Sequence, residues 1–166
     1  MSEIVPIIFI GLFCLCTTAL FAQHNTPDTI HALYTTDKIS FDGTLTESSW
    51  QKATPIKNFT QKELAFGKPS TEPTSVAIVY DNLNLYIGIW CYQKTPIRAK
   101  YMQRDFFYEE DDNFQVVISP FNDKRNGYLF VIIPNGARAD LLVSGNEEAN
   151  KDWNGVLVTK TSVTRE

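Results

Sequence analysis

The sequence predicts an all-β fold, an antiparallel β-sandwich with one short helical turn. Three observations predict it: short apolar runs rich in β-branched and aromatic residues alternate with turns, no long segment has helical periodicity, and residues 76–92 have the form of a β-hairpin. In that hairpin two apolar runs, 76–80 and 83–92, flank Asp81 and Asn82, whose side chains tolerate turn conformations. Both faces of the second run are apolar, so we expect this strand inside a packed structure and not at a solvent-exposed edge.

Residues 1–22 are expected to be an export signal. Residues 4–21 form an almost uninterrupted apolar run, and small Ala22 closes it before polar sequence begins. A membrane anchor is the alternative, because the run approaches the roughly 20 residues that span a bilayer. No basic stop-transfer cluster follows the run, which favours a cleaved signal peptide and an exported protein.

The composition is that of one globular domain. The chain has 166 residues, of which 43% are hydrophobic and 20% charged, and its net charge is −4 with no basic block. We therefore expect no nucleic acid as a partner. After signal cleavage Cys91 is the single cysteine, so the domain has no internal disulfide, and its place in an apolar strand favours a small buried side chain.

The remaining elements follow in chain order. Residues 23–37 are expected to be a polar, irregular leader, and the domain itself is expected to occupy 38–166. Within 44–53 a helical turn places Trp50 and Ala53 on one side. Polar loops or turns separate the apolar runs. The expected strands are 38–43, 56–61, the two strands of the hairpin, 114–118, 128–133, 137–143 and 156–163.

Catalysis has little support in the sequence. It contains no Gly-rich phosphate loop, nucleophile elbow, HExxH motif or Cys/His metal spacing. Both histidines, His24 and His31, fall in the expected leader, where a positioned base is unfavourable. The acidic run Glu109-Glu110-Asp111-Asp112 could provide a carboxylate pair for glycoside cleavage or oxygen ligands for calcium. We favour a solvated loop before a strand, because EF-hand spacing is absent.

Aromatic side chains are the more informative feature. Sugar rings present apolar C–H faces, so their binding sites combine flat aromatic platforms with surrounding polar groups. Trp50 and Trp90 lie in regular apolar patterns and are expected in the core. Tyr108 and Trp153 lie beside polar loops and are the better platform candidates, with core packing as an open alternative.

Several motifs together resemble family 9 carbohydrate-binding modules, over about residues 38 to 163. The set is most similar to the amino-terminal module of large exported bacterial envelope proteins. The motifs are Ile39-x-Phe41-Asp42-Gly43-x-Leu45-x-Glu47-x-x-Trp50-x-x-Ala53, Tyr80-Asp81-x-x-x-Leu85-Tyr86-Ile87-Gly88, Arg104-Asp105, Asp111-Asp112-x-Phe114, Phe121-x-Asp123-x-Arg125-x-Gly127-Tyr128-x-Phe130, Pro134-x-Gly136-x-x-x-Asp140 and Asp152-Trp153-Asn154-Gly155-Val156.

This resemblance implies a jelly-roll-like sandwich that binds a poly- or oligosaccharide and accompanies carbohydrate catabolism without being the hydrolase. It also implies a periplasmic, outer-membrane-associated or secreted location. Phe107 or Tyr108 falls nearest the position of a sugar-stacking aromatic, and Gln115 falls where the following strand offers a polar contact. Arg104 and Trp153 complete the candidate site. Calcium accompanies some members, and the resemblance assigns it no ligands in this chain.

Two departures from the family pattern leave other functions open. Val131 and Ile133 stand where sugar-binding members carry Arg and Asn, and neither can hydrogen-bond a hydroxyl. The family continues with further strands where this chain stops at Glu166, so we expect an incomplete module with an open sheet edge. The alternative is a structural or docking domain that contacts the missing downstream β-rich region or another envelope protein. A glycosidase that uses residues 109–112 is a third, less favoured reading.

Overall fold

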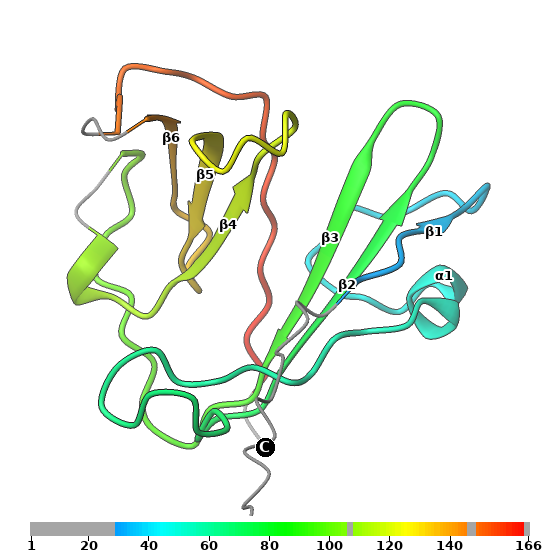
Figure 1. Ribbon diagram of the computed structural model, residues 1–166. Coiled ribbons are helices and arrows are strands. Elements are labelled where there is room, and N and C mark those ends of the chain that lie inside the picture. The colour runs from blue at the N-terminus through cyan, green and yellow to red at the C-terminus, as the bar shows by residue number, and fades with distance from the viewer. Residues whose placement is uncertain (1–28, 106–107, 146–148, 165–166) are drawn as a thin grey trace, which may run out of the picture.

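The computed structural model describes residues 29–105, 108–145 and 149–164, which form two three-stranded sheets with very little helix (Figure 1). The expected signal, residues 1–22, and the first part of the expected leader lie outside the described residues. The predicted all-β class is confirmed, and so is the short helical turn, α1. The elements are β1 (Leu33–Tyr34), α1 (Ser48–Lys52), β2 (Thr74–Tyr80), β3 (Leu85–Cys91), the 3-10 turn η1 (Tyr108–Glu110), β4 (Phe114–Ile118), β5 (Asn126–Ile132) and β6 (Arg138–Ser144).

β2 and β3 form the predicted hairpin, but β3 lies at the edge of its sheet. The Asp81 carboxylate fixes the turn by accepting hydrogen bonds from the N–H groups of Leu83 and Asn84, both at 2.7 Å. Within the described chain the sheet order is β1-β2-β3, and Leu85 on β3 is 55% exposed. Cys91 is exposed as well. The expectations of an interior strand and a buried thiol are therefore wrong, because apolar faces do not determine whether a further strand pairs with an edge.

The core of the first sheet forms between α1 and β2. Trp50 and Ala53 are each 6% exposed and pack with Ala77 and Val79, which are fully buried. The predicted side-by-side placement of Trp50 and Ala53 is confirmed. Gly88 on β3 makes the close approach possible, since a Cβ there would lie 2.7 Å from Cζ3 of the Trp50 ring.

The second sheet has its own core, and it contains the two residues in which the chain departs from the family pattern. β4 occupies the predicted residues, and β5 pairs antiparallel with both β4 and β6. Val131 is 0% exposed and Ile133 1% exposed, and both pack against Leu141 on β6. Their side chains face the interior, so neither position is available for contact with a ligand.

Three of the expected strands are not formed as strands. Residues 38–43 have no ladder, and 56–61 contributes only the isolated bridges Ile56↔Val76 and Thr60↔Pro69. Residues 156–163 are extended and pair with no strand of the described chain. In contrast, β1 lies in the stretch expected to be an irregular leader and pairs in parallel with β2. Period-2 patterning predicts an extended backbone, whereas a strand also needs a neighbour to accept and donate its hydrogen bonds.

The extended segment 153–164 connects the two halves of the structure. Side-chain burial alternates along it, which is the pattern of a strand with one covered face. Thr159 Oγ1 donates to the carbonyl oxygen of Gly136 (3.2 Å), in the turn between β5 and β6, and Ser162 Oγ donates to that of Gly43 (2.8 Å), ahead of α1. In Figure 1 this segment, coloured red, runs between the two sheets.

No helix in the described part of the chain has the length and hydrophobicity needed to cross a bilayer.

Candidate functional site

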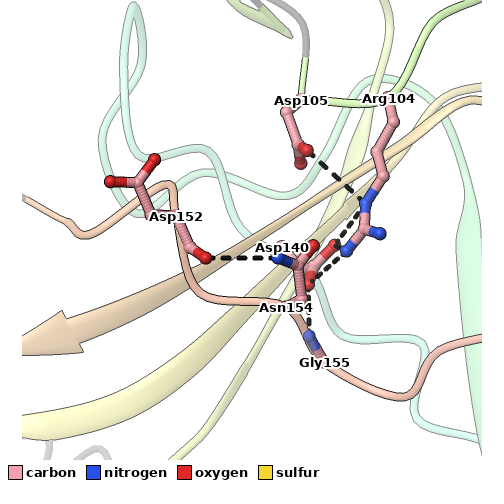
Figure 2. A network of polar contacts seen from close by, with 6 residues as sticks. All are labelled: Arg104, Asp105, Asp140, Asp152, Asn154 and Gly155. Atoms are coloured by element: carbon pink, nitrogen blue, oxygen red, sulfur yellow. Dashed lines mark hydrogen bonds and ion pairs between the residues drawn. The ribbon is translucent and has the colours of Figure 1, made fainter.

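Arg104, one of the candidate site residues, is held in a polar network with Asp140 (Figure 2). Its Nη2 donates to both carboxylate oxygens of Asp140, at 2.6 and 2.9 Å, and its Nε donates to Oδ1 at 3.2 Å. The Asp140 side chain is 0% exposed, whereas that of Arg104 is 38% exposed. The Gly155 N–H donates to Asp140 Oδ2, and Asp105 lies 3.5 Å from the Arg104 Nε. These contacts fasten the loop before η1 to β6 and to the segment after Trp153.

Trp153 packs on β5, beside this network. Its ring stacks on Tyr128 with centroids 4.7 Å apart and planes at 25°, and Phe130 lies 6.0 Å away in a tilted arrangement. Gly155 is required next to it, because a Cβ there would lie 2.7 Å from Cη2 of the Trp153 ring. Of the two interpretations of Trp153, packing is the one that these contacts support.

The other candidate residues are not part of the network. Gln115 is exposed on β4, and its Nε2 donates to Oδ1 of Asn113 at 3.0 Å. Tyr108 begins η1, and Phe107 lies outside the described residues. The structure thus brings Arg104 and Trp153 together and shows both engaged with other parts of the protein, while Gln115 stands apart from them.

The acidic run is only partly the solvated loop that we expect. Glu109 and Glu110 are exposed, but Asp111 is 6% exposed, and its Oδ2 accepts hydrogen bonds from the N–H groups of Lys100 (2.8 Å) and Tyr101 (3.1 Å). Asp111 is buried because it satisfies backbone donors of a neighbouring loop. In the described ranges no group of three His, Cys, Asp or Glu side chains is arranged to hold a metal ion.

A solvent-open cavity of about 280 Å³ lies between α1, the segment that follows it, and strands β2 and β3. Trp50, Trp90 and Tyr92 contribute aromatic surface to its wall. Trp90 stands nearly perpendicular to Trp50, with planes at 87° and centroids 6.2 Å apart. Trp90 is half-buried, not fully in the core as we expect from the sequence, and Tyr92 is 57% exposed. The remaining lining residues are apolar Leu45, Ala53 and Pro55 and polar Gln51, Lys57 and Ser75.

The polar part of this cavity was not predicted from the sequence. Gln51 comes from α1, Lys57 from the segment after it, and Ser75 from β2, so only the tertiary structure assembles them. The aromatic part has a sequence signal: Trp90 and Tyr92 are two residues apart at the end of the hairpin and therefore share a face.

The buried indole N–H of Trp50 has no hydrogen-bond acceptor among the residues that the structure describes. The Cε3–Cζ3 edge of the ring faces Gly88, so the opposite edge, which carries Nε1, points away from β3. A buried donor without a partner costs about 1–3 kcal/mol. Trp50 thus lines the cavity and also carries a buried donor that the described protein leaves unsatisfied.

Comparison with known proteins assigns the chain to no family: no family model, curated protein or solved structure matches it.

Proposed function

We propose that this chain is a non-catalytic carbohydrate-binding module of the family 9 type, a β-sandwich in an exported envelope protein that accompanies polysaccharide catabolism. The observation that carries the proposal is the cavity at the end of the hairpin. Trp90 and Tyr92 offer aromatic surface at its wall, and Lys57 and Ser75 offer polar groups close by. An apolar ring face beside convergent hydrogen-bonding groups is what a sugar requires of its site.

Binding is favoured over hydrolysis by the positions of the carboxylates. No Asp or Glu of the described ranges lines the cavity. In the acidic run, Asp111 and Asp112 accept hydrogen bonds from backbone N–H groups of residues 98–101, for example Arg98 N–H to Asp112 Oδ2 at 2.8 Å. A glycosidase needs two carboxyl groups that flank a bound sugar, about 5–9.5 Å apart, and carboxylates committed to fixing a loop are poor candidates for that work.

The original candidate residues take different parts in this proposal. Arg104 and Trp153 hold the polypeptide around Asp140 and Gly155, and contact with the sugar is assigned to Trp90 and Tyr92 instead. Gln115 is exposed on β4, where it is free to make a secondary contact with a long glycan; the proposal does not depend on it.

One observation favours a docking domain as the second candidate. The segment 156–163 is extended and unpaired, and it presents Val156 and Val158 to solvent, 104% and 63% exposed. An extended backbone whose outer row begins with two exposed valines is suited to pairing with a strand of a further β-rich region or of another envelope protein. This candidate predicts binding to protein and none to glycans.

Affinity electrophoresis in gels that contain soluble polysaccharides tests the proposal. We expect retardation of the chain in at least one gel of a broad panel, and a loss of about tenfold in affinity for Trp90→Ala, which removes about 1.4 kcal/mol of ring contact. The matched control is Phe66→Ala, which truncates an aromatic side chain that is 85% exposed and lies outside the cavity lining. Circular dichroism verifies that each variant is folded. No retardation by any glycan, or equal loss in both variants, would contradict carbohydrate binding at this cavity.

A further inference from the structure

The cavity has an unusual charge balance for a sugar site. Among the described residues, Lys57 is the only charged residue in its lining, and no carboxylate of that part of the chain lines the cavity with it. The other polar groups are the amide of Gln51 and the hydroxyls of Ser75 and Tyr92. The site is therefore rich in donors, carries one positive charge and is poor in strong acceptors.

The excess of donors and the positive charge in the cavity determine which class of sugar it can bind well. The hydroxyl of a neutral sugar both donates and accepts, and a carboxylate side chain is the strongest acceptor that a protein can offer it. A lysine ammonium has three donors and no acceptor, so it leaves the donor half of each hydroxyl unmet. A sugar that carries its own carboxylate reverses the requirement, because the ligand then supplies the acceptor and the negative charge.

We propose that the cavity selects an acidic sugar, a hexuronate residue of a polysaccharide, with its carboxylate against Lys57 and a C–H face of its ring on Trp90 or Tyr92. This rests on the proposed function and names the sugar class of the same site.

The net charge of the chain, −4, opposes the approach of an acidic ligand at long range. A polyanion is repelled at long range by the whole protein, but charges farther apart than about 8 Å are largely screened at physiological ionic strength. The contact between Lys57 and a bound carboxylate is shorter than that distance. Selectivity for the acid is therefore expected to persist at 0.15 M salt, and short oligouronides are expected to bind at least as well per site as long polymers.

Calorimetric titration of the full chain with short oligosaccharides of galacturonate, glucuronate and mannuronate, each beside its methyl ester, tests this. The ester keeps the ring and removes the charge, so it is the matched neutral ligand. We expect at least one acid to bind about tenfold more tightly than its ester. Lys57→Gln should lower the affinity for the acid to that of the ester and leave the ester unchanged, whereas Lys62→Gln, an exposed lysine outside the lining, should change neither.

The outcomes separate the two proposals. Equal binding of acids and esters, or neutral glycans bound more tightly than every acid, overturns the selectivity and leaves carbohydrate binding in place. An acid preference that survives Lys57→Gln overturns the assignment to this cavity. If neither acids, esters nor neutral glycans bind the folded chain, the proposed function fails together with its sugar class.

Discussion

Substitution of Asp140 by Asn perturbs the best-connected buried charge that the structure describes. Removing one partner of a buried ion pair costs about 3–5 kcal/mol, mainly because the other charge is left without compensation. Here the charge left behind belongs to Arg104, whose side chain is 38% exposed and 3.5 Å from Asp105, so water and a second carboxylate still solvate it. Asn also keeps an oxygen for the Gly155 N–H. We therefore expect Asp140→Asn to lower the free energy of unfolding by less than that range, about 2–3 kcal/mol.

Substitution of the other partner of the ion pair, Arg104, should lower the free energy of unfolding further. Arg104→Met leaves the Asp140 carboxylate, which is 0% exposed, with the Gly155 N–H as its remaining hydrogen-bond donor among the described residues. We expect a loss of about 4 kcal/mol. Urea unfolding at pH 7, followed by tryptophan fluorescence and circular dichroism, measures both values. Asp152→Asn is the control, because it neutralises a nearby exposed carboxylate (Figure 2). A loss for Asp140→Asn within 0.5 kcal/mol of the control, or larger than that for Arg104→Met, would refute the reasoning.

Three further predictions concern the rest of the chain. Gly88→Ala places a methyl group 2.7 Å from the Trp50 ring and should cost about 1–3 kcal/mol in thermal unfolding, more than Gly127→Ala, whose nearest neighbour is 3.1 Å away; equal losses would contradict this. The N–H groups of the hairpin turn lower the pKa of Asp81 below its ordinary 3.8, so its contribution to stability is complete above that value and is lost as the pH falls through the lowered pKa. Asp81→Asn should therefore flatten the fall of Tm between pH 4 and pH 2, and an unchanged slope would show that the turn does not stabilise the ionised carboxylate. Although Cys91 is exposed as a residue, partial desolvation of its thiol raises the pKa of that thiol above its ordinary 9.0. Iodoacetamide should therefore alkylate Cys91 more slowly at pH 7.5 in the folded chain than in urea, as measured by mass spectrometry of the Cys91 peptide. Equal rates in the two states would disprove this effect.

The parts of the fold that were predictable are those that depend on local chemistry. The hairpin follows from Asp81 and its flanking apolar runs, and β4 follows from the run that begins at Phe114. Residues 38–43 alternate apolar and polar side chains, as a half-buried strand does, and side-chain burial alternates along 156–162. Residues 38–43 and 156–163 form no ladder within the described chain, because pairing depends on a neighbour that such a pattern does not specify. For the same reason β3 was expected in the interior of a sheet and lies at an edge.

The site was less predictable, because its residues meet through distant contacts. From the sequence, Arg104 is a plausible ligand contact; in the structure its guanidinium is engaged by Asp140, which lies 36 residues later on β6. Trp153 is a plausible platform until Tyr128 covers one of its faces. The cavity draws Lys57 and Trp90 from separate elements, and neither has a sequence neighbour that points to the other.

The position of the segment 153–164 in the chain has a consequence for the order of assembly. Within the described chain, the hairpin β2–β3 and the meander β4–β5–β6 are each formed from strands adjacent in sequence, so both can form soon after they are synthesised. Three residues of the segment 153–164 hydrogen-bond to the two halves: Gly155, Thr159 and Ser162. They are synthesised after all the strands of both sheets. The two sheets are thus expected to fold as separate units and to be fixed relative to each other last. In pulsed hydrogen exchange during refolding, the amides of both sheets should become protected before the N–H of Gly155 does.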